Sequence, residues 1–450
     1  MQLNEMSIRQ LGRAYRDGSA SPVEAVRDCL DAVDRHAAAN AYCKIDADRA
    51  LAWAKEAEER FHAGTGRGPL DGIPVAVKDV LHVVGWPTRR GSHGSPYKAA
   101  EFSSPAVDRL LEGGAVLVGK TTTSELGWKA TTDSPLTGVT PHPHIEGLTS
   151  GGSSGGSASA VALSTVPVAL GTDAGGSIRI PAAFCGIVGA VATYGRVPLW
   201  PVPPLSTLVR VGPLCRSVDD AATVLACISR PDPRVPATGF GTIAGAADSS
   251  ERRHIGVLRQ IAGQDMTPGV AARFDGAVAA IEAAGHSVRE LTLGTRSDLD
   301  TFETLWSSGH AYFVDALDDR ARDALDPGLL ALADRGRGVS AADYLKAEAR
   351  KAALQHETSR LLESVDVLLS PTVGVEPFST GSDVPPDWYS PHWWTWAGFT
   401  LAFNLTGHPA VSLPIPAAAG LLPTGVQLVG RYGADEELMR FARAVETILK

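Results

Sequence analysis

The sequence predicts an α/β protein with a large mixed, mainly parallel β-sheet, because apolar strands alternate with helices along the chain. The order strand, helix, strand occurs twice, at 73–78, 105–111 and 115–118 and again at 255–258, 270–284 and 288–291. This order suggests parallel strands joined by crossover helices. The 450 residues are sufficient for a sizeable hydrophobic core.

Composition indicates an ordinary globular protein without a basic surface. Hydrophobic residues make up 44%, charged residues 20%, and the formal net charge is −9, so we expect no nucleic-acid partner. The chain has no signal-peptide pattern and no apolar run of about 18 residues, so we expect a cytoplasmic protein without membrane contact. The five scattered cysteines lack a Cys-x-x-Cys pair, which argues against a disulfide framework or a zinc site.

The first helices have recognisable boundaries. Ser21 is a capping residue, Pro22 suits the first helical position and Glu24 completes a capping box, so a helix is expected to begin there. A second helix is expected over 48–60. A Gly-, Ser- and Ala-rich segment follows at 147–190.

The remaining elements complete one predicted domain, 1–450. Residues 235–365 are expected to form a variable, mainly helical insertion packed on the main sheet. The last strands and the final helix are expected at 365–369, 410–414, 426–429 and 435–449.

The Gly- and Ser-rich segment allows several interpretations. A flexible linker is disfavoured, because its glycines bracket apolar runs that form core. A phosphate-binding loop would need a Lys after Gly156, and a dinucleotide-binding loop would need a preceding strand; neither is present. A hydroxyl nucleophile in a cradle of backbone N–H groups remains, with Ser177 following Gly175 and Gly176.

A serine nucleophile needs a base. The segment contains no His, which disfavours a Ser-His-Asp arrangement without excluding it. A buried, neutral lysine could serve instead, because burial lowers the pKa of an ammonium group. Lys78 follows the apolar run 73–77 and is placed for such burial.

Three separated motifs resemble the amidase signature family. They are Gly-Ile-Pro-Val-Ala-Val-Lys-Asp at 72–79, Gly-Gly-Ser-Ser-Gly-Gly-Ser at 151–157 and Gly-Thr-Asp-Ala-Gly-Gly-Ser-Ile-Arg-Ile-Pro-Ala-Ala-Phe-Cys-Gly at 171–186. Similarity extends across most of the chain, including Asn-Leu-Thr-Gly-His-Pro at 404–409, and is weakest over about 235–365. The resemblance implies an amidase-signature fold with helices on both faces of the sheet.

The resemblance also implies a function and a set of site residues. Ser177 would be the nucleophile, Ser153 the bridging serine, usually on a cis peptide, and Lys78 the base of a Ser-cisSer-Lys triad. The oxyanion-hole donors would be the N–H groups of Ala174, Gly175, Gly176 and Ser177. Taken alone, Lys78 would be a surface lysine and Ser153 a helix cap. The family uses no metal or organic cofactor, so none is expected.

The predicted reaction is hydrolysis of carbon–nitrogen acyl bonds in small aryl or alkyl amides, with carbamates (urethanase activity) and esters as extensions. The rival is the amidase, or glutaminase, component of a tRNA-dependent amidotransferase. That branch commonly has Ser-Leu-Asp-Gln before its Gly-Pro, whereas Val209 replaces the acid in the stretch that begins at Ser206. We therefore expect a small-molecule amide or carbamate substrate and a monomer or homodimer. A non-catalytic binding module is a third possibility, which intact Lys78, Ser153 and Ser177 disfavour.

Aromatic residues are concentrated at 387–399, where four of the chain's nine tryptophans lie. Two interpretations remain open at this point. The tryptophans belong either to ordinary core packing or to an aromatic wall for an apolar substrate.

Overall fold

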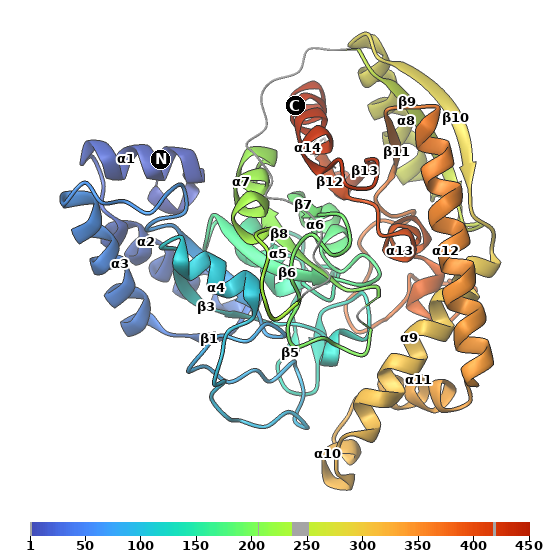
Figure 1. The fold of residues 1–450 in the computed structure, drawn as a ribbon, viewed down its shortest axis with the longest axis horizontal. Helices are drawn as coiled ribbons and strands as arrows, with labels where there is room; N and C mark the ends of the chain where they lie inside the picture. Colours follow the sequence, from blue (N-terminus) through green and yellow to red (C-terminus); the bar gives the residue numbers. More distant parts are fainter. Residues whose placement is uncertain (1, 206, 236–251, 417–419) are drawn as a thin grey trace.

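The computed structural model describes residues 2–205, 207–235, 252–416 and 420–450, and these contain one eleven-stranded sheet in the order β1-β3-β2-β6-β8-β7-β12-β13-β11-β9-β10 (Figure 1). The strands of this sheet are β1 (Tyr42–Ile45), β2 (Pro74–Lys78), β3 (Val116–Thr121), β6 (Val168–Asp173), β7 (Val188–Val191), β8 (Arg210–Cys215), β9 (His254–Ile261), β10 (Ser287–Leu293), β11 (Val367–Pro371), β12 (Ala410–Ile415) and β13 (Thr424–Val429). A short hairpin, β4 (Asp133–Ser134) and β5 (Gly138–Val139), lies apart from it.

Helices surround the sheet. The α-helices are α1 (Ile8–Asp17), α2 (Pro22–Arg35), α3 (Ala47–His62), α4 (Pro105–Glu112), α5 (Gly155–Ala162), α6 (Arg179–Cys185), α7 (Val218–Ile228), α8 (Pro268–Ala283), α9 (Ser297–Asp315), α10 (Asp319–Asp323), α11 (Pro327–Arg337), α12 (Ala341–Glu363), α13 (Gly398–Thr406) and α14 (Asp435–Leu449). Short 3₁₀ turns include η3 (Glu125–Gly127) and η4 (Trp393–Thr395). The N-terminal helices lie at one end of the sheet, and α9 to α12 lie at the other (Figure 1).

Both faces of the sheet are covered, as expected. Successive residues of a strand point to opposite faces, and β2 illustrates this: Val75 and Val77 pack into one hydrophobic cluster and Ala76 into another. The first cluster includes side chains of α1, α4, α7, α8 and α14, and the second includes side chains of α5, α6, α9, α11, α12 and α13. The predicted α/β fold with a large mixed sheet is therefore confirmed.

The expectation that the sheet is mainly parallel is wrong. Parallel pairs occur in the two strand–helix–strand units, where β2 pairs with β3 and β6 and β9 pairs with β10 and β11. Every neighbouring pair from β6 through β8, β7, β12 and β13 to β11 is antiparallel, as is the pair β1–β3. These central strands are buried on both faces, so their apolar residues do not alternate with polar ones and reveal nothing about direction.

The segment predicted as an insertion contributes to the sheet. Its strands β9 and β10 form one edge, and β9 pairs with β11. Helix α9 packs against both α11 and α12, on the same side of the molecule as that edge (Figure 1). Residues 236–251 lie outside the described residues, and the interpretation of 235–365 as a variable insertion stays a prediction.

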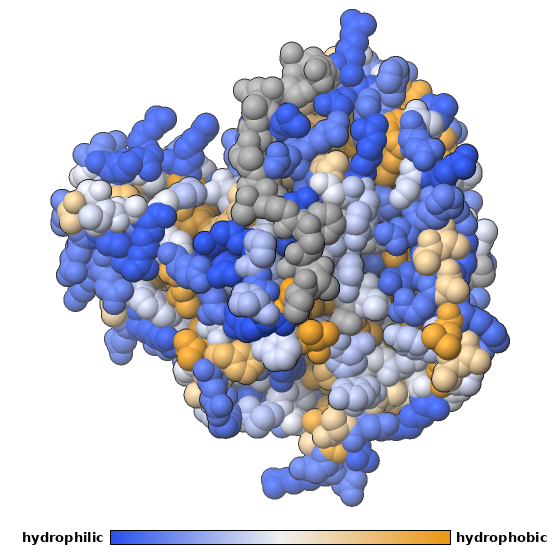
Figure 2. All heavy atoms as spheres, viewed as in Figure 1, coloured by the Kyte–Doolittle hydropathy of each residue, from blue (hydrophilic) through white to orange (hydrophobic). Residues whose placement is uncertain are grey.

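The outer surface is mainly polar on the face in Figure 2, with small, scattered apolar areas. Within the described ranges, none of the helices combines the length and apolarity needed to cross a bilayer.

The helix start predicted at Ser21 is confirmed and is testable. Ser21 Oγ accepts the Glu24 N–H at 3.2 Å, while the Glu24 carboxylate accepts the Ser21 N–H at 2.8 Å. We expect Ser21→Ala to lower the free energy of unfolding by about 1 kcal/mol, because the Glu24 N–H at the start of α2 loses its acceptor, the Ser21 Oγ. Denaturant unfolding measures the change. Ser21→Thr, which keeps the capping oxygen, is the control, and an equal loss in both variants would contradict the capping role.

Candidate active site

The lysine strand lies at the centre of the first parallel unit. All five residues of β2 are buried, and β2 runs between β3 and β6. Parallel neighbours end at the same edge of a sheet, so Lys78, the last residue of β2, lies beside Thr172 near the end of β6. The Lys78 Nζ donates to Thr172 Oγ1 at 3.1 Å. Topology therefore brings the amine to the loop that carries Ser177.

Lys78 also contacts the first predicted serine. Its Nζ lies 2.7 Å from Ser153 Oγ, and both side chains are buried. Burial lowers the pKa of Lys78 to about 7, although the nearby negative charge of Asp173 partly opposes the shift. A substantial fraction of the Lys78 amine is therefore uncharged at neutral pH, and in this form its nitrogen can accept a hydrogen bond from the Ser153 hydroxyl.

Ser153 is held by a tightly packed glycine loop. The peptide bond between Gly152 and Ser153 is cis, as the resemblance implied. A Cβ on Gly152 would lie 2.4 Å from the carbonyl oxygen of Thr131, so no larger residue fits without a shift of the backbone. The next residue, Ser154, ties this loop to the second one, because its N–H donates to the Ser177 carbonyl at 3.1 Å.

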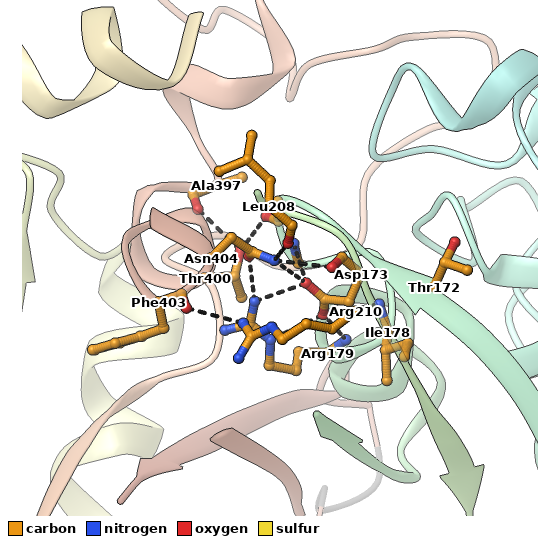
Figure 3. Close-up of polar contacts among 12 residues, drawn as sticks. Thr172, Asp173, Ile178, Arg179, Leu208, Arg210, Ala397, Thr400, Phe403 and Asn404 are labelled. Carbon is orange, nitrogen blue, oxygen red and sulfur yellow. Dashed lines mark hydrogen bonds and ion pairs between the residues drawn. The ribbon is translucent and has the colours of Figure 1, made fainter. Parts of the chain in front are cut away.

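The loop that carries Ser177 is organised by the carboxylate of Asp173. The carboxylate accepts the N–H groups of Gly176 at 2.9 Å and Ile178 at 3.2 Å. Figure 3 shows the guanidinium of Arg179 and the amide of Asn404 pointing at the same carboxylate, with distances of 2.9–3.0 Å and 2.8 Å. The charge of Arg179 and the hydrogen bonds hold the pKa of Asp173 well below its usual range against the opposing effect of burial.

Two glycines in this loop are packed against aromatic and hydroxyl side chains. A Cβ on Gly175 would lie 2.7 Å from the ring of Trp393, and a Cβ on Gly176 would lie 2.2 Å from Thr400 Oγ1. Gly176 also has a φ of 121°, which favours glycine. Trp393 and Thr400 therefore restrict the position of the backbone before Ser177.

The four oxyanion donors expected from the sequence are not equivalent. The Gly176 N–H donates to the Asp173 carboxylate at 2.9 Å and therefore points away from an oxyanion at Ser177. Within the described part of the chain, the N–H groups of Ala174, Gly175 and Ser177 make no hydrogen bond to the protein. The prediction for Gly176 is therefore corrected, and the other three remain candidate donors.

Ser153 and Ser177 open into one pocket of about 290 Å³, here called the serine pocket. Its wall is mostly apolar and includes Leu81, Leu126, Leu199, Trp200, Leu205, Val209, Trp306 and Phe313. Thr172 and Ala174 lie beside the serines, and His82 and Arg90 supply further polar groups. Ser206, where the stretch that ends in Val209 begins, lies outside the described residues.

The aromatic-wall interpretation of 387–399 is wrong. No tryptophan of that segment is among the described residues that line the serine pocket. Trp393 and Trp396 are buried, and Trp396 stacks on Phe184 of α6 with ring centroids 6.2 Å apart. Trp393 packs behind Gly175 and against Phe302. The segment therefore belongs to the core and backs the Ser177 loop, while the pocket's own aromatic residues come from the loop at 199–205 and from α9.

Sequence reasoning missed several residues of the site. Thr172 contacts Lys78, Asn404 binds Asp173, and His82 and Arg90 face the pocket. Asn404 could have been found from the sequence, since it is the first residue of the family-like motif at 404–409. His82 and Arg90 follow Lys78 by 4 and 12 positions, but nothing in their spacing indicates that the chain between them folds back onto the pocket.

A buried lysine amine in contact with one of two serines at a pocket is an arrangement suited to acyl transfer through a serine. Residues 24–439 match the family model described as Amidase, and the chain belongs to this family of carbon–nitrogen hydrolases.

Known relatives cover nearly the whole chain. A glutamyl-tRNA(Gln) amidotransferase component from Acidobacterium capsulatum is 31% identical over 473 residues, with 97% of this chain and 98% of that protein covered. A crystal structure described as an amidase is 30% identical, with a TM-score of 0.89 over 99% of this chain and 100% of that chain. A 6-aminohexanoate cyclic dimer hydrolase is 27% identical, with a TM-score of 0.86 over 100% and 98%.

The Asp173 network generates a stability prediction. Asp173→Asn leaves the buried Arg179 without its counter-ion and presents an N–H₂ group to backbone donors. We expect the free energy of unfolding at neutral pH to fall by about 3–5 kcal/mol, measured by chemical denaturation.

The pH dependence supplies the control. Because folding lowers the pKa of Asp173, its contribution is present above the unfolded pKa of about 3.9 and is lost as the pH falls further. The difference between wild type and Asp173→Asn should therefore shrink only below about pH 4. A small, pH-independent difference would contradict the role given to this carboxylate.

Proposed function

We propose that this chain hydrolyses the carbon–nitrogen acyl bond of small amides with an apolar body, using Ser177 as nucleophile and Ser153 and Lys78 as its proton relay. The observation that carries the proposal is the 2.7 Å contact between Lys78 Nζ and Ser153 Oγ at a pocket that Ser177 also lines. A buried amine with a pKa of about 7 is a suitable base for a serine relay.

In the proposed mechanism, uncharged Lys78 accepts the Ser153 proton as Ser153 accepts that of Ser177. Ser177 Oγ bonds to the substrate carbonyl carbon, and the resulting oxyanion accepts the N–H groups of Ala174, Gly175 and Ser177. Each such donor is typically worth about 2.7–4 kcal/mol. The relay returns a proton to the leaving nitrogen as its bond to carbon breaks. Water then releases the acid from Ser177 by the same route.

Substrate class follows from the pocket wall. Leucine, proline and aromatic side chains favour alkyl or aryl groups on the amide. Carbamates and esters fit the same acyl-transfer chemistry, and a carbamate would afterwards lose carbon dioxide. We propose no cofactor, and a monomer or homodimer in the cytoplasm.

A second candidate is the glutaminase component of a tRNA-dependent amidotransferase. It is favoured by relatives such as the 31% identical protein of Acidobacterium capsulatum, which bears that description. Two observations favour the first candidate. Val209, which replaces the acid of that branch, lies on the pocket wall, and no Asp or Glu is among the described residues of that wall. A free amino-acid ammonium would find no carboxylate there.

The nucleophile is tested by labelling with a fluorophosphonate probe. We expect one modified residue, Ser177, and no labelling of Ser177→Ala. Ser19→Ala, at an exposed turn before α2, is the control and should label like wild type. Labelling that persists in Ser177→Ala would contradict the assignment of the nucleophile.

The base is tested by the pH dependence of kcat/KM for a nitroanilide. Only uncharged Lys78 can accept the Ser153 proton, so activity should rise as the pH increases through about 7 and then level off. Lys78→Met should lower kcat/KM by at least about 1000-fold, as expected for the loss of a base in a serine relay. A rate that is flat from pH 5 to 9 would overturn the role of Lys78.

The lowered pKa of Lys78 also predicts how the stability of the protein depends on pH. Since the unfolded lysine has a pKa of about 10.4, the unfolded chain holds more protons between pH 7 and 10.4. The Lys78 contribution to the free energy of unfolding should therefore rise over that window. Comparison with Lys78→Met, which lacks the titrating group, isolates it; curves that stay parallel would argue that the amine is not desolvated.

The choice between the two candidate functions is tested by a hydrolysis screen with the chain purified alone. We expect turnover of anilides or carbamates without partner proteins. Exclusive turnover of glutamine, with activity that depends on co-purifying proteins, would instead establish the second candidate.

A further inference from the structure

Arg90 is the one formally charged side chain among the described residues that line the serine pocket. Its backbone is fixed on both sides: its N–H donates to the Asp79 carbonyl at 3.0 Å, and its carbonyl accepts the Leu126 N–H at 2.8 Å. Its φ is 52°. The residue is therefore held at the pocket wall by main-chain contacts, and its guanidinium contacts His82, which also lines that pocket.

No carboxylate in the described part of the chain forms an ion pair with Arg90. The negative group that acts on it is Asp79, whose charge is matched by the buried Lys120 at 2.7 Å. Arg230, at the surface, by contrast pairs with Glu112. A partly buried guanidinium without a counter-ion is costly unless other groups accept its hydrogen bonds, and a bound anion would supply both acceptors and charge.

The side-chain contact that Arg90 does make leaves its charge intact. Its guanidinium lies 3.1 Å from His82 Nε2. Burial and the positive charge of Arg90 lower the pKa of His82 to about 4, so the imidazole is neutral and accepts this hydrogen bond. His82 thus orients the guanidinium, whose remaining N–H groups suit a carboxylate, with its two oxygens.

We propose that Arg90 binds a carboxylate of the substrate, so that the preferred substrates are amides with an acid group separated from the scissile bond by a hydrocarbon segment. This inference rests on the proposed function. Leu81, Leu126 and Leu205 on the wall suit the hydrocarbon segment, while Ser177 meets the carbonyl. The acid lies on either the acyl or the amine side of the substrate.

The test uses two matched pairs of substrates. The acyl-side pair is glutaryl 4-nitroanilide and neutral pentanoyl 4-nitroanilide, and the amine-side pair is N-pentanoyl 4-aminobenzoate and pentanoyl anilide. We expect wild type to prefer the acidic member of one pair. In Arg90→Met, the ratio of kcat/KM between acidic and neutral members should fall by about 30-fold, as for the loss of a charge-assisted hydrogen bond.

The control variant is Arg89→Met. Arg89 precedes Arg90 but donates from its side chain to the Ser92 carbonyl and does not line the serine pocket. It should leave the ratio unchanged within about 2-fold, the scale of an ordinary surface substitution. No preference for an acid in either pair, or equal losses on acidic and neutral members in Arg90→Met, would overturn the inference.

Binding separates this inference from the proposed function. If no anilide is hydrolysed, the proposed function fails, and calorimetry with the monoanilide of glutaric acid and with N-pentanoyl 4-aminobenzoate still tests Arg90. We expect the Kd of one of these two acids to be about 30-fold weaker in Arg90→Met, again the loss of one charge-assisted contact, and an equal Kd in the two proteins for both acids would overturn the inference. If Arg90→Met does not fold by circular dichroism, Arg90→Gln provides the same comparison.

Discussion

The buried carboxylate of Asp173 is the interaction on which the site depends. It ends β6, accepts the N–H groups of Gly176 and Ile178 on either side of Ser177 and binds Arg179 at the start of α6. Arg179 in turn donates to Gln427 of β13 and Asn404 of α13. One charge therefore joins the loop that carries Ser177 to the antiparallel centre of the sheet and to a helix far away in the sequence. The desolvation cost is offset only because every contact is present together.

Much of the site was predictable because its residues lie within contiguous motifs. Lys78 was expected at the end of an apolar strand and Ser177 after paired glycines, while Ser153 was singled out only by the resemblance of its motif to the amidase signature family. The structure brings Lys78 and Ser153 into contact. The Ser21 helix start was readable for the same reason: a cap involves residues three positions apart.

Features that depend on distant contacts were not predictable. Strand direction in the sheet centre is set by pairing partners, and β7, β8, β12 and β13 are too uniformly buried to reveal it. The Gly176 N–H could not be excluded as an oxyanion donor until the position of Asp173 was known. The tryptophans at 387–399 had the composition of a pocket wall, but their packing behind Gly175 depends on α6 and α9, which lie far away in the sequence.

Trp393 packs against Gly175, on the core side of the loop that carries Ser177. These tight contacts leave little room for substitutions on that side, because a larger residue there would displace the loop and with it Ser177. In front of it, the wall from Leu199 to Leu205 belongs to a loop outside the Asp173 network. Under the proposed function, new substrate preferences can therefore arise by changes in that wall while Lys78, Ser153 and Ser177 stay unchanged.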